Sequence, residues 1–573
     1  MENLPLKCMK SKNIFLVAII VVAALLRLWR LDVIPPHLTP DEAALGYNAY
    51  SVLKTGRDEY GEILPIIFKS FGDYKPGLYV YLTVPYVAVF GLNEWSVRLP
   101  SAIAGVLAVW LVYKIIIEFS FNEKVRPLTN NYRRVASIAA LMLAVSPWHI
   151  HFSRGAWEAN ISLTLTLLGV YFFLRALKKP KLLIFSSLSF SLTLFTYQGA
   201  KLSTSIVIFI LLITYWDELK GLIRAKSVLV GTIIVGLVIA SPILLSLFSE
   251  QAGRLNVFSV FSYPRPKEYL QDFLDQGDEK VGSLNYYLFH SESLNFTRGI
   301  MGRWFNHFGG RFLFFEGDYQ NPRHTSPNHG MLLLSDMFLL IVGIISWIKT
   351  KNSRLKTFTI IWLVLAPLPA VLSRDQVHAI RALNMVIPLT LISASGLVYI
   401  LEKTKNVTSR WLKVISYLFL SVLVLGSLVY YLDSYFGHLA KHDSKYWDYG
   451  YKQIVEAVTP VQKNYKEIKV QQSFAQPYIY FLFYQKYDPR NYQRQARFTE
   501  SEFKGDVGYV TKLDNISFTG IDWSVNRGDN GCLIIGDTLR IPDADSSDPK
   551  LFTKFGEIKY LNGTTAFKII EVK

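Results

Sequence analysis

Charged residues are scarce in this chain of 573 residues. Only 18% of its residues are Asp, Glu, Lys or Arg, whereas 51% are hydrophobic, and the mean hydropathy is +0.24. This balance argues against an ordinary soluble protein of this length. Several apolar runs approach the ~20 residues that are needed to cross a bilayer, so we expect an integral membrane protein.

Cysteine is also rare, with Cys8 and Cys532 as the two examples. No Cys and His residues have the spacing of a metal site in the sequence. The topology predicted below places the two cysteines on opposite sides of the membrane, which excludes a disulfide between them. The N-terminus resembles a signal peptide, but "VVAALLRLWR" lacks a small-x-small cleavage site, so we expect a retained first helix.

The net charge of +17 raises the question of a nucleic-acid partner. Lys and Arg lie between the apolar runs rather than on one soluble face, which argues against nucleic-acid binding. Two interpretations of the excess remain. It reflects cytoplasmic loops rich in Lys and Arg, or it provides affinity for anionic lipid or phosphate.

Eleven apolar runs are candidate membrane spans. A twelfth, Gly77–Leu92, is short and has Pro85 in its middle. The eleven lie near residues 14–28, 97–117, 135–150, 161–174, 182–197, 202–216, 228–248, 331–348, 358–372, 383–401 and 412–432.

The basic residues decide whether the twelfth run crosses. If it does not, 19 Lys and Arg lie in five short cytoplasmic loops, at residues 124–134, 175–181, 220–226, 349–356 and 403–413. If it does, all 19 face outside. The positive-inside rule therefore favours 11 spans with the N-terminus in the cytoplasm. Gly77–Leu92 is then a juxtamembrane helix, and a re-entrant or partial span is the open alternative.

This topology divides the chain into two parts. Residues 1–432 form the predicted membrane domain, with long outer loops at 29–98 and 249–330. Residues 433–573 are more polar and contain the strand-like "GCLIIGDTLRI" and the hairpin-like "FGEIKYLNGTTAFKIIEV". We expect them to form a small extracytoplasmic α/β domain.

Carboxylates and cations gather at the predicted outer ends of the apolar runs. The first outer loop holds Asp41 and Glu42 in "TPDEA", and then Asp73 and Lys75 in "FGDYKPGLYVYL". The later outer loops add Arg154, Glu158, His324 and Arg381. All of these residues would face one chamber at the membrane surface.

Each of these residues also has an ordinary structural explanation. The acidic residues of "TPDEA" suit the first turn of a helix that Thr39 caps. Arg154 and Glu158 have the i,i+4 spacing of a helical ion pair. Lys75 could be an interfacial lysine whose stem lies along apolar surface, and Arg381 could bind lipid headgroups.

A lipid-phosphate sugar donor would explain why these groups lie together. Its phosphate sits at headgroup level, and cleavage leaves a charged phosphate that cations stabilise without a general acid. The acceptor hydroxyl or amine needs a carboxylate as general base, for which Asp41 is well placed. One base opposite a departing phosphate implies inversion at the anomeric carbon.

The order of the motifs resembles a known family. An Asp-Glu pair follows the first run, "YKPGLYVYL" precedes "VRLPSAIAG", and "SRGAWE" comes after the third run. This order is similar to that of the GT-C glycosyltransferases of the protein O-mannosyltransferase and lipid A aminoarabinose transferase superfamily. The resemblance is best over residues 31–177. It implies a polytopic α-helical membrane protein with about 11 transmembrane helices.

The resemblance also implies roles for the residues. Asp41 would be the catalytic base, with Glu42 as its motif partner, and Lys75 would contact the carrier phosphate. Arg381 would be a second phosphate contact, an assignment that rests on its position in the chain. The residues expected to line the cavity or meet the acceptor are Asp73, Arg154, Glu158 and His324. The family usually has Asp where Glu158 stands and Pro where Gly77 stands.

The implied donor is a polyprenyl-phosphate sugar, and the acceptor is a protein, a lipid or a glycan. Some GT-C enzymes need a divalent metal, but the sequence indicates no metal site. The expected location is the plasma membrane. The alternative function is a secondary transporter or lipid flippase, although internal repeats and midplane charges are lacking. A scaffold role would leave the outer polar cluster unexplained.

Overall fold

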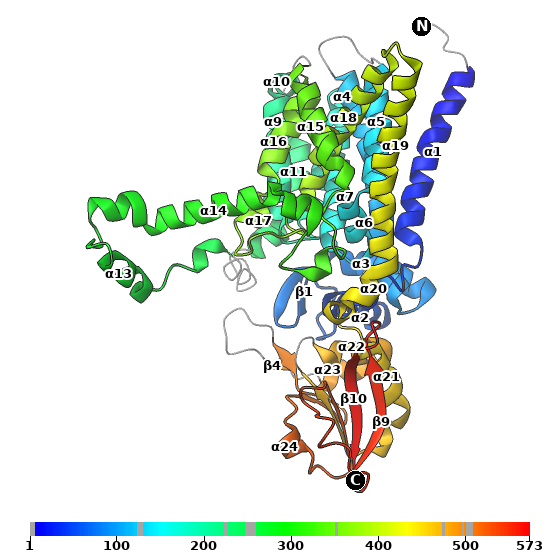
Figure 1. Ribbon diagram of the computed structural model, residues 1–573, viewed down its shortest axis with the longest axis vertical. Helices are drawn as coiled ribbons and strands as arrows, with labels where there is room; N and C mark the ends of the chain where they lie inside the picture. Colours follow the sequence, from blue (N-terminus) through cyan, green and yellow to red (C-terminus); the bar gives the residue numbers. More distant parts are fainter. Residues whose placement is uncertain are drawn as a thin grey trace.

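The computed structural model describes residues 6–122, 130–222, 226–246, 259–349, 353–472, 476–495, 498–499 and 508–573. A helical bundle forms one end of the molecule, and the C-terminal residues form a sheet with flanking helices at the other (Figure 1). The first outer loop lies between these two parts, with α2 (Pro40–Thr55) next to both.

Each of the eleven predicted spans falls on helical segments. The bundle consists of α1 (Leu6–Leu28), α4 (Glu94–Phe121), α5 (Asn130–Val145), α6 (Pro147–Arg154), α7 (Glu158–Ala176), α8 (Leu183–Thr193), α9 (Ala200–Thr214), α11 (Lys226–Ser246), α15 (Leu334–Lys349), α16 (Arg354–Leu365), α17 (Leu368–Val371), α18 (Val386–Lys405) and α19 (Arg410–Leu432). Among the described residues, six helices are long and apolar enough to cross a bilayer, or seven with a bent pair. The chain is thus a multi-pass membrane protein, and the number 11 stays a prediction.

A bend divides the predicted span at residues 135–150 into two helices. Helix α5 ends at Val145, and α6 begins at Pro147 with a 54° change of direction. Ser146 is extended at the break and its hydroxyl accepts a hydrogen bond from the His149 amide. Since proline has no amide hydrogen to donate and favours the first turn of a helix, Pro147 starts a new helix here instead of continuing α5.

The run with Pro85 forms α3 (Leu78–Phe90), at the end of the bundle nearest the C-terminal part (Figure 1). Its 13 residues give a length of about 20 Å, whereas the hydrocarbon core is about 30 Å thick. Helix α3 by itself is therefore shorter than the hydrocarbon core, and its juxtamembrane place stays a prediction.

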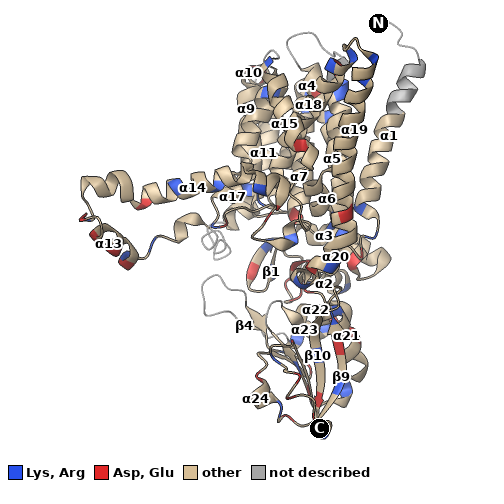
Figure 2. Ribbon diagram, viewed as in Figure 1, with Lys and Arg blue, Asp and Glu red and all other residues tan. Residues whose placement is uncertain are grey.

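Basic side chains gather at the opposite end of the bundle, as Figure 2 shows. Parts of the five basic loops, including Lys124, Arg126, Arg224 and Lys351, lie outside the described residues. The second long loop contains α13 (Lys267–Asp275) and α14 (Glu292–Phe308), which project sideways from the bundle (Figure 1).

The C-terminal residues form a six-stranded mixed sheet, which confirms the predicted α/β character. Its strand order is β6-β7-β3-β8-β10-β9, with β3 parallel to both β7 and β8. All residues of β8 are buried, as expected for an apolar strand in a sheet covered on both faces. The strands are β3 (Glu467–Gln471), β6 (Lys512–Leu513), β7 (Ile516–Thr519), β8 (Cys532–Gly536), β9 (Phe552–Lys559) and β10 (Thr565–Val572).

Shorter elements surround this sheet. They are α21 (Tyr451–Val458), α22 (Pro477–Tyr484), α23 (Pro489–Gln495), α24 (Trp523–Asn526) and the small pair β4 (Phe498–Thr499) and β5 (Tyr509–Val510). The short helix α20 (Leu439–Asp443) follows the end of α19 (Figure 1). Strands β9 and β10 form the predicted hairpin. Cys532 is buried and free, while the side chain of Cys8 is not among those described.

The first outer loop and the C-terminal part share one hydrophobic core. Helix α2 packs on α22, and a Cβ atom added at Gly46 would lie 2.6 Å from the ring of Phe483. The Tyr480 hydroxyl donates a hydrogen bond to the Leu38 carbonyl at 3.0 Å. The Lys452 ammonium pairs with Glu94 at 2.9 Å. These contacts fix the C-terminal part against the loop that holds Asp41.

Close packing of α15 on α18 depends on two glycines. A Cβ atom at Gly396 would lie 2.1 Å from the Leu339 carbonyl oxygen, and one at Gly343 would lie 2.2 Å from that of Ile392. Both obstacles are backbone atoms, so a side chain cannot be accommodated unless the helices separate.

We therefore expect Gly396→Ala to destabilise the bundle by about 1–3 kcal/mol, the usual cost of overpacking. Gly426→Ala in α19 is the matched control, since no atom lies within 4 Å of its added Cβ and Ala favours helix. Thermal unfolding in detergent measures both variants. Equal midpoints for the two would contradict this account of the α15–α18 contact.

Candidate active site

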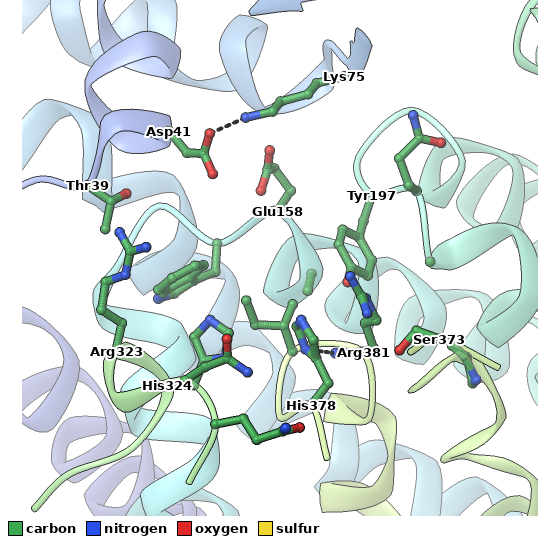
Figure 3. A pocket seen from close by; sticks show the side chains of 18 of the residues that line it. Thr39, Asp41, Lys75, Glu158, Tyr197, Arg323, His324, Ser373, His378 and Arg381 are labelled. Atoms are coloured by element: carbon green, nitrogen blue, oxygen red, sulfur yellow. Dashed lines mark hydrogen bonds and ion pairs between the residues drawn. The ribbon is translucent and has the colours of Figure 1, made fainter. Parts of the chain in front are cut away.

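A cavity of about 1100 Å³ lies where the bundle, the first outer loop and the C-terminal part meet (Figure 3). Its wall includes apolar side chains near the bundle, such as Leu202 and Leu372, and polar ones from the C-terminal part, such as Asp448 and Tyr449. The cavity is therefore bordered both by helices of the bundle and by residues beyond the last of them.

Asp41 lies in the first turn of α2 because Thr39 caps that helix. The Thr39 hydroxyl accepts a hydrogen bond from the Glu42 amide, and the Glu42 carboxylate accepts one from the Thr39 amide. This reciprocal capping box directs the Glu42 side chain back toward Thr39. Asp41 lines the cavity, with 58% of its side chain exposed.

Lys75 approaches Asp41 from a short hairpin. Strands β1 (Ile67–Ser70) and β2 (Asp73–Pro76) are antiparallel, and Phe68 is opposite Lys75. The turn between them places Phe71 and Gly72 at φ 55° and 79°. The Lys75 ammonium forms an ion pair with the Asp41 carboxylate, and its side chain is only 12% exposed (Figure 3). The predicted base and the predicted phosphate ligand are thus in direct contact.

Glu42 does not face the cavity, although it is adjacent to Asp41 in sequence. Its side chain is 1% exposed and pairs with the Arg98 guanidinium at 2.9 Å. It also accepts a hydrogen bond from the Ala156 amide at 2.9 Å. The predicted catalytic partner is therefore part of a buried network, because helical geometry directs consecutive side chains to different sides.

Arg154 also differs from its expected place. It is the last residue of α6, whereas Glu158 is the first of α7, so the two are not on one helix. The Arg154 guanidinium donates hydrogen bonds to the carbonyls of Leu26, Trp29, Arg30 and Ile34, at 2.8–3.2 Å. It fixes the end of α1 and is not part of the cavity wall.

Asp73 is half-buried at the start of β2 and is likewise not part of the cavity wall. Glu158, His324 and Arg381 do line the cavity, as expected. In Figure 3, Glu158 points toward the pair of Asp41 and Lys75. The Arg381 guanidinium donates a hydrogen bond to Asp375 at 2.7 Å, which holds the arginine in the wall.

Several cavity residues were not among those predicted. They include Lys201, Arg323, His378, Lys445 and Asp448, together with Tyr449, Tyr451, Tyr560 and Phe567. Arg323 pairs with Asp448 at 3.3 Å across the junction between the second long loop and the C-terminal part. Burial raises the pKa of Asp448 to about 6, against the opposing effect of Arg323. No sequence motif marks Asp448.

The cavity has an excess of positive charge. Five basic side chains line it, against three carboxylates, which are Asp41, Glu158 and Asp448. Burial lowers the pKa of His378 well below its usual range, so this residue is neutral at neutral pH. Because low-dielectric walls strengthen electrostatic attraction, such a cavity is suited to an anionic ligand.

One group of three ligand-type residues lies in the described part of the chain, Asp318, His324 and His378. Burial opposes ionisation of Asp318, but hydrogen bonds from His324, the Ala379 amide and Asn321 outweigh it and lower its pKa. Asp318 therefore stays ionised beside the two imidazoles.

Solved structures share this architecture. ArnT of Cupriavidus metallidurans, bound to undecaprenyl phosphate, aligns with 97% of this chain and 97% of its own, with a TM-score of 0.51 and 13% identity. The oligosaccharyltransferase AglB of Archaeoglobus fulgidus, in complex with an inhibitory peptide and a dolichol-phosphate, also has a TM-score of 0.51 and 13% identity. That alignment covers 84% of this chain and 64% of AglB. The chain has the GT-C fold.

Sequence comparisons agree with this fold. The family described as dolichyl-phosphate-mannose-protein mannosyltransferase matches residues 74–245. YycA and YkcB of Bacillus subtilis (strain 168), both named as candidate mannosyltransferases, are 32% identical over 108 residues and 25% identical over 177 residues. The two alignments cover 19% and 30% of the present chain, but only 14% of YycA and 22% of YkcB. The resemblance to GT-C glycosyltransferases is thereby confirmed.

Replacing Glu42 tests whether it has a mainly structural role. Glu42→Gln leaves the buried Arg98 guanidinium without a counter-charge, and we expect a loss of about 3 kcal/mol in the free energy of unfolding. Glu62→Gln, at an exposed position of the same loop, is the control and should leave stability unchanged. Thermal unfolding of the purified proteins measures both. An unchanged midpoint for Glu42→Gln would refute the structural role.

Proposed function

We propose that this chain is a membrane glycosyltransferase that moves a sugar from a polyprenyl-phosphate donor to an acceptor. The main support is the contact of Asp41 with Lys75 in a cation-rich cavity that adjoins both the bundle and the C-terminal part. A prenyl chain would lie against the apolar helices, and a water-soluble acceptor group would enter beside the C-terminal part.

In this proposal Lys75 and Arg381 bind the donor phosphate. Both line the cavity, and their charges would stabilise the negative charge that develops on the leaving group. Lys201 and Arg323 line the same cavity and add to the favourable potential. The bond between the anomeric carbon and the phosphate oxygen breaks, and its electron pair stays on the phosphate.

Asp41 would act as the general base. Its ion pair with Lys75 holds the carboxylate close to the phosphate site. The acceptor hydroxyl or amine loses its proton to Asp41 as its oxygen or nitrogen attacks the anomeric carbon. Attack from the face opposite the phosphate gives inversion, and the reaction leaves polyprenyl phosphate as the second product.

Glu42 and Arg154 would act as positioning residues. Glu42 and Arg98 fix the N-terminus of α2, which sets the direction of Asp41. Arg154 joins the end of α1 to the same region. Asp73 helps to build the turn before Lys75, and Glu158 and His324 contribute to the surface that meets the sugar or the acceptor.

We also propose the orientation in the membrane. The basic end of the bundle would face the cytoplasm, and the cavity and residues 433–573 would lie on the extracytoplasmic side of the plasma membrane. The acceptor is then an extracytoplasmic protein, lipid or glycan. Residues 1–432 would form the transferase domain, with 433–573 closing the cavity.

Asp41→Asn should abolish transfer while donor binding and folding are retained. Loss of a general base typically reduces the rate by about 10²–10⁴-fold. Purified protein would receive a panel of polyprenyl-phosphate sugars with candidate acceptors, and release of free polyprenyl phosphate would be measured. Asp32→Asn, at an exposed position of the same outer loop and outside the cavity wall, should keep its activity. Comparable turnover in Asp41→Asn and the unaltered protein would reject the assignment of the base.

Lys75→Ala should weaken donor binding by roughly 10- to 100-fold, as expected from the loss of one charge-assisted hydrogen bond. Lys75→Arg should restore part of the affinity because it restores the charge. Lys69→Ala is the control, since Lys69 lies in the same hairpin but is not part of the cavity wall. Direct binding of a polyprenyl-phosphate sugar would be titrated. Equal affinities for all the variants would exclude a phosphate role for Lys75.

A further inference from the structure

Three potential metal ligands converge on one wall of the cavity from two different loops. Asp318 and His324 come from the end of the second long loop, and His378 comes from the loop that precedes α18. Each residue offers one ligand atom, and these atoms all lie within 4.8 Å of one another. A single ion at about 2.0–2.2 Å from each ligand would draw these atoms to roughly 3.3–3.6 Å from one another, which small side-chain rotations from this spacing would allow.

The surrounding protein holds these side chains in place. Asp318 accepts hydrogen bonds from the Asn321 amide group at 3.0 Å and from the Ala379 backbone amide at 2.8 Å. The His378 backbone amide donates a hydrogen bond to the His307 imidazole at 3.2 Å. Such outer contacts orient ligands in protein metal sites and increase their affinity.

A metal ion would also need access to these ligands from the cavity. The Asp318 side chain is fully buried, whereas the side chains of His324 and His378 are each 11% exposed. Both imidazoles line the cavity, and their ring centres are 5.2 Å apart (Figure 3). Asp318 would bind an ion from the buried side. The remaining coordination positions of the ion would be open to the cavity.

We propose that Asp318, His324 and His378 bind a divalent transition metal ion, of which Zn²⁺ is the best match. Two imidazole nitrogens and one carboxylate form a ligand set that suits Zn²⁺ and related ions. Mg²⁺ prefers six oxygen ligands and keeps most of its water, so it should not compete. The open positions would take water or an anionic oxygen. Occupancy by a donor phosphate rests on the proposed function, whereas ion binding does not.

The competing explanation is a hydrogen-bonded Asp–His pair only. The His324 Nδ1 atom lies 2.9 Å from the Asp318 carboxylate, which satisfies both groups without an ion. That pair does not involve His378, whose Nδ1 atom accepts a hydrogen bond from the Arg381 backbone amide at 3.4 Å, whereas a metal site uses all three residues. Substitution of His378 therefore distinguishes the two explanations most sharply.

Binding would be measured by isothermal titration of Zn²⁺ into the full-length protein in detergent, after removal of metal with a chelator. We expect one saturable site per chain and no response to Mg²⁺. Asp318→Asn and His378→Gln should each lower the Zn²⁺ affinity by at least about 10-fold. His442→Gln is the matched control. His442 also contacts a carboxylate, that of Asp443 at 2.6 Å, but is exposed outside the cavity and should leave affinity unchanged.

A second measurement uses the unaltered protein, in case a variant does not fold. Co²⁺ would replace Zn²⁺, and its d–d absorption would report whether nitrogen and oxygen ligands hold it in four- or five-coordinate geometry. Absence of saturable Zn²⁺ binding, or affinity unchanged in folded His378→Gln, would overturn the proposal. No donor or acceptor is present in either assay. An inactive protein that binds Zn²⁺ would therefore contradict only the transferase, and an active protein that binds none would contradict only the metal site.

Discussion

The buried ion pair of Arg98 and Glu42 is the interaction on which the geometry of the cavity depends. The Arg98 and Glu42 side chains are 0% and 1% exposed. Arg98 also donates hydrogen bonds to the carbonyls of Leu31, Pro35 and His37, at 2.7–3.0 Å. One guanidinium thus joins α4 to the segment between α1 and α2. Because a charge buried in this way needs full compensation, the segment has little freedom to move.

This constraint explains how an exposed carboxylate can be held in a defined place. Glu42 completes the capping box with Thr39, and the first turn of α2 then presents Asp41 to the cavity. Lys75 meets Asp41 from a separate hairpin, so the pair forms only when both pieces of the loop are fixed. Nearby, Arg323 and Asp448 connect the second long loop with the C-terminal part. The cavity is therefore the product of three segments far apart in sequence.

Sequence patterns were most informative for residues whose role depends on local order. Asp41 was predicted from the carboxylates that follow the first apolar run, and Lys75 from the Lys-Pro motif that precedes another; both line the cavity. The same reasoning placed Arg154 and Asp73 in the cavity, but the structure places them outside its wall. Polar residues at the end of a span all look alike in sequence. Whether a guanidinium meets a ligand or four backbone carbonyls depends on which loops fold over it.

The sequence by itself determined the class of the protein. Apolar runs of membrane length, basic loops on one side and the motif order indicated a multi-pass GT-C chain, because these features depend on short-range periodicity and charge. Only the tertiary structure decided which helix bends at Pro147 and that Glu42 is buried. It also brought Asp318, His324 and His378 together and made Asp448 part of the cavity. These outcomes depend on contacts between residues far apart in the chain, and a single sequence holds no direct record of such contacts.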